Sequence, residues 1–91
     1  MDVAHMDFNA SHELANKLIS AQNQIAELVV STVSSVDQYV GSQWISSSAE
    51  QFLSEIQEWG NQQRQSLDRL NDIIAHLENE INRMQQEAQS M

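Results

Sequence analysis

The sequence predicts an all-α protein, an antiparallel hairpin of two long amphipathic helices joined by a short turn around Trp44. Three observations predict this fold. The 91 residues include no proline and only two glycines, Gly41 and Gly60, whereas a strand-rich domain needs many turn residues. Good helix formers dominate residues 49–89. Apolar residues also recur at helical spacing through both halves of the chain.

Length and composition indicate that the hairpin needs reinforcement. A chain this short buries little surface on folding and usually depends on disulfides, a metal or another chain. The sequence has no cysteine, which excludes disulfides and thiolate metal sites. We therefore expect one domain over residues 1–91, reinforced by self-association or by a partner chain.

The first helix is expected from about residue 10 to residue 40, with Asn9 or Ser11 as its N-cap. Two neighbouring apolar stripes follow its helical steps, which makes an apolar face wide enough to touch more than one neighbour. One stripe comprises Leu14, Leu18, Ala21, Ile25, Leu28, Thr32, Val36 and Tyr39, and the other comprises Ala15, Ile19, Ala26, Val29, Val33, Val36 and Val40.

The turn is expected at residues 41–47. Gly41 suits the left-handed position just past a helix end. Because the stop and start signals lie so close together, the two helices must run antiparallel. The start signals are two overlapping capping boxes, Ser47 with Glu50 and Ser48 with Gln51.

Trp44 lies inside this turn. Its large apolar area predicts that it folds back and plugs the end of the bundle, with its indole N–H directed at a carbonyl or water. Tryptophan is also enriched where proteins grip their partners, and that role is the alternative interpretation.

The second helix is expected from about residue 48 to residue 87, roughly 60 Å long at 1.5 Å per residue. Between Trp59 and Leu67 the apolar steps predict a stutter, and Gly60 marks a tight contact or a bend. Elsewhere the steps alternate between three and four residues, as in a helix that faces another helix. The stripe comprises Ala49, Phe52, Ile56, Trp59, Leu67, Leu70, Ile74, Leu77, Ile81, Met84 and Ala88.

One hairpin gives each helix only one partner, so part of the apolar surface stays uncovered. A second hairpin, identical or similar, would cover it and form a dimeric four-helix bundle. The residues expected in the packing seams are Leu18, Ile25, Leu28, Phe52, Ile56, Trp59, Leu67 and Leu70.

Charge and motif content exclude several classes of function. A net charge of −9 repels phosphate backbones and anionic lipid surfaces, so nucleic acid is not an expected partner. No stretch approaches the roughly 20 apolar residues of a membrane span. The sequence has no Gly-rich phosphate loop, cysteine nucleophile or Gly-x-Ser-x-Gly elbow. We therefore expect no enzymatic activity, no catalytic residues and no cofactor.

Asp72, His76 and Glu80 follow one another at four-residue steps, an arrangement that could hold a divalent metal. Carboxylate-bridged metal sites in helical bundles use a Glu-x-x-His step from paired helices, which this sequence lacks. We interpret the three residues as part of a solvated charged face and expect no metal.

Around the turn the chain resembles the WXG family, named for a Trp-X-Gly motif. These are small early-secreted-antigenic-target-like helical hairpins that are substrates of type VII secretion. The most specific match is Trp44-Ile-Ser-Ser-Ser-Ala49-Glu-Gln-Phe52, in which Ala49 and Phe52 stand five and eight residues after the tryptophan, as in the family. Ser46 stands where the family has glycine. Length, acidity and layout match over nearly the whole chain.

The resemblance implies a homodimeric or heterodimeric four-helix bundle that is made in the cytoplasm and secreted without a cleaved signal peptide. Met1 to Phe8 have no basic cluster or apolar core of a conventional signal peptide. The family's C-terminal signal, a tyrosine followed four residues later by an acid, is missing, since the only tyrosine is Tyr39. The last helix does resemble the family in an apolar–acid–apolar series, Ile74, Glu78 and Ile81, with Gln85 at the fourth position.

Two other classes of protein fit the same pattern. A cytoplasmic adaptor or chaperone would use the broad apolar face to receive a helix of a secreted client. A filament or needle subunit would polymerise through head-to-tail contacts, whereas a dimer closes on itself.

Overall fold

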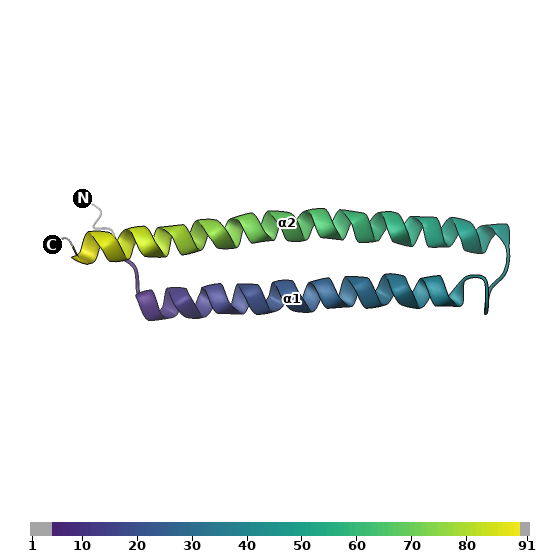
Figure 1. The fold of residues 1–91 in the computed structure, drawn as a ribbon, viewed down its shortest axis with the longest axis horizontal. Helices are drawn as coiled ribbons and strands as arrows, with labels where there is room; N and C mark the ends of the chain where they lie inside the picture. Colours follow the sequence, from purple (N-terminus) through teal and green to yellow (C-terminus); the bar gives the residue numbers. More distant parts are fainter. Residues whose placement is uncertain (1–4, 90–91) are drawn as a thin grey trace.

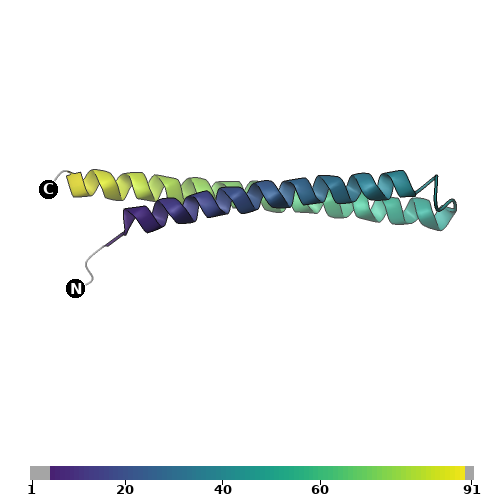
Figure 2. The ribbon, with the colours of Figure 1, turned by 90° about the horizontal axis from the view of Figure 1, so that it is seen from below.

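The computed structural model describes residues 5–89 as two long α-helices, α1 (Phe8–Tyr39) and α2 (Ser47–Gln89), with no strand in that range. The helices run antiparallel and lie side by side (Figures 1 and 2) in a rod of 68 × 20 × 18 Å. The predicted two-helix hairpin is therefore confirmed. The observed helix bounds differ from the expected ones by no more than a few residues.

α1 begins earlier than its apolar spacing indicates, because Asp7 is its N-cap. The Ala10 N–H donates a hydrogen bond of 3.0 Å to the Asp7 carboxylate. A carboxylate at this place also interacts favourably with the positive end of the helix dipole. The expected caps, Asn9 and Ser11, are wrong, since both lie inside the helix.

The turn confirms the expectation for Gly41, whose φ of +91° lies in the left-handed region. The Gly41 N–H donates to the Trp44 carbonyl, and the Trp44 N–H donates to the Tyr39 carbonyl, at 3.0 and 3.2 Å. The cap of α2 is Ser46, whose hydroxyl accepts a 3.0 Å hydrogen bond from the Ala49 N–H. The two predicted capping boxes are wrong, because both of their serines already lie within α2.

The seam between the helices follows α2 in unbroken steps of four and three residues. It passes through Gly60 and Gln63, so the predicted stutter is not observed. Gly60 has the tight contact that the sequence indicates, since a Cβ placed there would lie 3.0 Å from Cγ2 of Val33. The seam positions of α2 are Ala49, Leu53, Ile56, Gly60, Gln63, Leu67, Leu70, Ile74, Leu77 and Ile81.

The side chains that are fully buried in this seam are few and mostly small: Ala15, Val29, Ala49, Ile74 and Ile81. Polar side chains also link the two helices, at Gln22 and, near the open end, between His12 and Gln85 at 3.4 Å. The Gln22 amide donates to the Leu67 carbonyl at 3.4 Å and to the Asn71 side chain at 3.3 Å. Because these bonds link positions far apart in the sequence, they help to fix which residues of α1 lie beside which residues of α2.

Candidate partner-binding face

A row of exposed residues runs along α2 next to the seam, at every seventh position from Phe52. Phe52, Trp59 and Ile73 in this row are large apolar residues with 38, 37 and 51% of their surface exposed. Ser66 lies midway between Trp59 and Ile73 and is also exposed. Positions seven apart lie on one side of a helix, so these residues form a continuous stripe.

α1 carries a matching exposed stripe. Leu14, Ile25 and Tyr39 are about half exposed, and Leu28 has 65% of its surface exposed. They belong to the first of the two sequence stripes, whereas the second stripe, which includes Ala15 and Val29, is the one that faces α2. The broad apolar face of α1 is therefore divided between an inner stripe and an outer stripe.

The two outer stripes lie on the same side of the hairpin. At the turn they meet through Trp44, whose ring centroid is 6.4 Å from that of Tyr39 and 5.8 Å from that of Phe52. Along antiparallel helices, positions that flank the seam on one side face each other over the whole length. We call this surface the apolar face; its apolar members are Leu14, Ala21, Ile25, Leu28, Tyr39, Phe52, Trp59 and Ile73.

The opposite side, which we call the polar face, differs in its α2 residues. It includes exposed Glu50, Gln57, Arg64, Asn71 and Glu78, again at every seventh position. Glu78 lines a shallow hollow near the open end of the hairpin together with Ile19 of α1. Apart from Ile19 and Val30, this face presents few large apolar side chains in the described residues.

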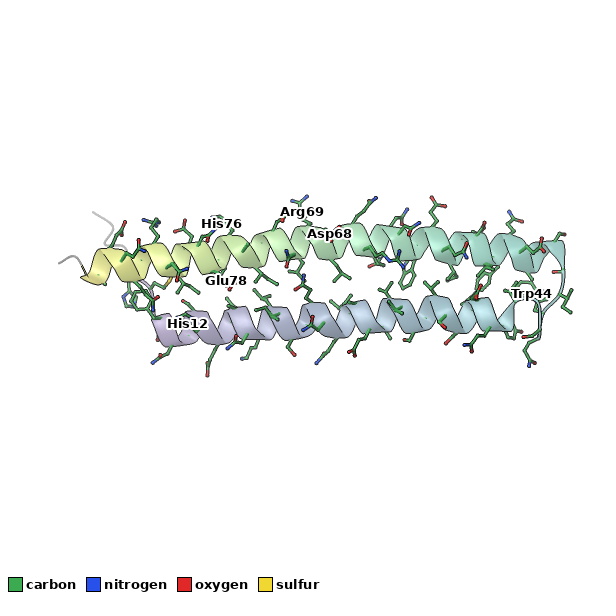
Figure 3. All side chains as sticks on the ribbon, viewed as in Figure 1. His12, Trp44, Asp68, Arg69, His76 and Glu78 are labelled. Carbon is green, nitrogen blue, oxygen red and sulfur yellow. The ribbon has the colours of Figure 1, made fainter. Side chains whose placement is uncertain are left out.

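The turn motif builds the closed end of the hairpin. Trp44 lies between the helix ends (Figure 3) and is half-buried against two aromatic rings. Ala49 is completely buried, and Ser46 caps the helix that carries Ala49 and Phe52. Trp44 therefore closes the end of the hairpin, as its size indicates, while its neighbour Ile45 is 78% exposed.

The structure divides the seam residues expected from the sequence into two groups. The first group is partly buried between α1 and α2 and comprises Leu18, Ile56, Leu67 and Leu70. The second group, Ile25, Leu28, Phe52 and Trp59, is exposed on the apolar face. Sequence reasoning missed Ile73 on this face, although its distance of 14 residues from Trp59 is the signal that identifies it.

The apolar–acid–apolar series of the last helix does not form one free surface. Ile74 and Ile81 are 3% and 1% exposed and lie in the seam against α1. Glu78 is exposed on the polar face. In this hairpin the two isoleucines stabilise helix pairing.

Charged residues border the apolar face along α2. The row of α2 that borders this face repeats every seventh residue from Glu55, and Figure 3 shows Arg69 and His76 of this row turned away from α1. Charges of both signs therefore lie beside the apolar face on α2: Glu55, Arg69 and Arg83 belong to the bordering row, and Glu80 continues the row of Phe52.

An ion-pair network lies at the open end of this side. Arg83 bonds to Glu80 and to Glu87, with nitrogen–oxygen distances of 2.7 Å. The hydrogen bond from Arg83, followed by its charge, lowers the pKa of the Glu80 carboxyl. His76 lies 3.8 Å from Glu80 and is mostly exposed. Among residues 5–89 no group of three His, Cys, Asp or Glu side chains is arranged to hold a metal ion.

Neither helix, over the part of the chain described, is long and apolar enough to cross a membrane. Comparisons with protein-family models, with curated proteins and with solved structures gave no match to this chain. The functional argument therefore depends on the geometry of the hairpin and of its apolar face.

Proposed function

We propose that this chain is a non-enzymatic helix-binding protein that pairs with a second helical hairpin through its apolar face. The observation that carries the proposal is the placement of its largest apolar side chains. Leu28, Tyr39, Phe52 and Trp59 lie together on one exposed side. A contiguous apolar patch of this kind on a small soluble protein marks an interaction surface.

Pairing would also supply the stability that a single hairpin lacks. The isolated rod has one seam, in which only a few small or medium side chains are fully buried. Covering the apolar face with two further helices gives a four-helix bundle with a second, larger apolar core. Full burial of a large apolar side chain is worth about 1.5–3 kcal/mol, and association would gain the share of this that belongs to the part still exposed in the hairpin.

We propose further that the protein is of the WXG type and is secreted as a dimer by a type VII-like system. The closed end of the hairpin supports this proposal, because the ring of Trp44 packs against that of Phe52 and Ala49 is fully buried in the first turn of the same helix. Ser46, which replaces the family's glycine, caps α2 and so has a structural role compatible with the same turn. Recovery of the chain from the medium of intact cells, dependent on such a system, is the expected result. Strict retention in the cell together with a larger client would contradict it and favour the adaptor function.

The pairing itself is tested by mass measurement in solution. Sedimentation equilibrium of the full chain, alone and with the product of a neighbouring gene, should give the mass of two hairpins in at least one condition. Leu28→Asp should weaken association at least about 100-fold, because a carboxylate would be buried without a partner.

Val30→Asp is the matched control. Val30 is 60% exposed, close to the 65% of Leu28, and a two-residue step on a helix places it on the other side, toward the polar face. Both variants add the same charge to the same helix. Equal association of the two variants would show that the apolar face is not the binding surface. A chain that stays monomeric at high concentration with every tested partner would refute the pairing.

A further inference from the structure

The fully buried residues of the seam lie in two separate clusters. On α1 no residue between Ala15 and Val29 is fully buried, and on α2 none between Gly60 and Ile74 is, so each helix has a gap of fourteen positions. At about 1.5 Å per residue each gap is roughly 20 Å long. The cluster toward the open end comprises Ala15, Ile74 and Ile81, and the cluster toward the turn comprises Val29, Ala49 and Gly60.

The two gaps lie beside each other along the rod. At one edge, a Cβ placed on Gly60 would lie 3.9 Å from Cγ1 of Val29. Within the gaps, the Gln22 amide bonds to the Leu67 carbonyl. The hairpin therefore has one central section without a fully buried residue, which we call the seam centre: residues 16–28 of α1 and 61–73 of α2.

The seam centre is weakly packed because glutamines occupy two of its inward positions. Gln22 and Gln63 are only partly buried between the helices, and so are the neighbouring leucines, among them Leu67 and Leu70. The two hydrogen bonds of Gln22 are long, at 3.4 and 3.3 Å. Such bonds replace bonds to water, so their net contribution to stability is small. The seam centre therefore joins the two buried clusters loosely.

The two ends of the hairpin are also held differently. The turn connects the helices at the closed end (Figure 1), where the ring of Trp44 packs against Tyr39 and Phe52. At the other end the helices are connected only by way of the closed end. Pairing Gln22 with Leu67 while the closed end is unfolded would close a loop across 45 residues, which has an entropic cost. The closed end can therefore stay paired without the open end, whereas the reverse is disfavoured.

We propose that the hairpin opens in two steps, and that the part beyond the seam centre separates as one unit while the part next to the turn stays paired. We call these parts the open half, residues 8–15 and 74–89, and the closed half, residues 29–60. Many proteins open in cooperative units of this kind, each with its own free energy. The seam centre is the boundary between the two units.

The device controls access to a second apolar surface. In the closed state Ile74 and Ile81 are 3% and 1% exposed against α1. Separation of the open half would expose both of them, together with Leu77, along one side of α2. This surface is distinct from the apolar face and is hidden until the open half separates. The inference therefore goes beyond the proposed function and does not require it.

Thiol labelling tests the proposal, because the natural chain contains no cysteine. Ala15→Cys and Ala49→Cys replace one buried alanine in each half, at positions that are 6% and 0% exposed. Iodoacetamide in excess would react with each thiol when its half opens. Relative to the denatured chain, the Ala15→Cys variant should react at least about tenfold faster than the Ala49→Cys variant. Equal rates would overturn the proposal.

Filling the seam centre distinguishes a cooperative unit from gradual fraying. Gln22→Leu combined with Gln63→Leu makes these two seam positions apolar and should slow the reaction of the Ala15→Cys variant by about tenfold, because the two halves would then open together. The matched control combines Gln24→Leu with Gln62→Leu, two exposed glutamines of the same helices, and should leave the rate unchanged. An unchanged rate in the filled seam would show fraying from the end and overturn the proposal.

Amide hydrogen exchange of the natural chain gives a second measurement that needs no variant to fold. Protection should be nearly uniform within each half, higher in the closed half, and should change in a step across the seam centre. Association through the apolar face would raise the protection of both halves and preserve the step, so the result does not depend on pairing. Protection that declines steadily along α2 from the turn to the open end would contradict the two-step opening.

Discussion

The two sets of apolar side chains in this hairpin differ in their aromatic content. The seam between α1 and α2 combines small residues with aliphatic side chains that are buried or partly buried, and has no aromatic ring among its α2 positions. The apolar face has the aromatic rings of Tyr39, Phe52 and Trp59, beside the exposed aliphatic side chains of Leu14, Ile25, Leu28 and Ile73. In a self-sufficient small domain we expect aromatic side chains to be mostly buried.

This difference indicates that the seam and the apolar face have different roles. Small seam residues let the helices approach closely. At Gly60 the approach is so close that the side chain of Val33 leaves no room for a Cβ without a shift. Close approach sets the distance between the two helices. Where a partner covers the apolar face, as we propose, the stability of the helices and the association of the chains should be linked.

The largest effect expected within the seam comes from Ile81→Ala. Ile81 is 1% exposed, so its truncation leaves a cavity and should lower the free energy of unfolding by about 2–4 kcal/mol. Thermal unfolding followed by circular dichroism, at one fixed protein concentration, measures this loss.

Ile73→Ala is the matched comparison, since it removes the same atoms from the same helix at a residue that is 51% exposed. It should lower the free energy of unfolding of the hairpin by less than about 1 kcal/mol and should mainly weaken association. The effect on association would appear as a dependence of the melting temperature on protein concentration. If both variants unfolded alike at every concentration, the distinction between seam and face would not hold.

The sequence predicted the elements of the fold because each depends on local chemistry. Helical spacing defined both helices, and Gly41 marked the turn, since a left-handed position favours glycine. The caps were misplaced because several polar residues near each helix start, Asp7 and Asn9 or Ser46 and Ser47, satisfy the same local rule. Only the observed hydrogen bonds distinguish them.

The row of α2 that faces α1 could not be identified from the sequence in the same way. Phe52 and Leu53 are neighbours, and so are Trp59 and Gly60, so two heptad rows offset by one residue compete for the seam. Hydrophobicity alone favours the row with tryptophan. The observed seam uses Leu53 and Gly60 because the distance between the helices depends on the smallest side chains, a tertiary property that no single helix reveals.

Gly60→Ala should have an intermediate effect and test whether the close approach is needed. Alanine favours the helix by about 1 kcal/mol over glycine. Its Cβ would lie 3.0 Å from Cγ2 of Val33, which must shift, and this cost should offset the gain, leaving the free energy of unfolding clearly below the parent's value plus the propensity gain. A gain of the full propensity difference in a chemical denaturation curve would contradict a tight seam at this point.

Combining Gly60→Ala with Val33→Ala separates the gain in helix propensity from the cost of the contact with Val33. The smaller residue at position 33 removes the contacting methyl group, so the added Cβ should then be tolerated and the propensity gain should appear. A double-mutant cycle over the two positions, read from the same denaturation curves, gives the coupling directly.

The smallest effect is expected from Arg83→Gln, outside both sets of apolar residues. Arg83 lowers the pKa of Glu80, mainly through its hydrogen bond. A carboxyl with a lowered pKa in the folded state stabilises that state above its ordinary pKa, and the contribution is lost as the pH falls through the folded-state pKa. The variant should therefore melt slightly below the parent at neutral pH, and the difference should shrink below about pH 4.3 and vanish below the lowered pKa of Glu80.

Salt should reduce the same difference, because the pair is exposed to solvent. Titration of the Glu80 carboxyl by NMR should show its pKa moving upward in the variant, toward the ordinary value. If the difference in melting temperature persisted unchanged into acid, Arg83 would be acting through packing of its side-chain stem on α2 and not through its charge.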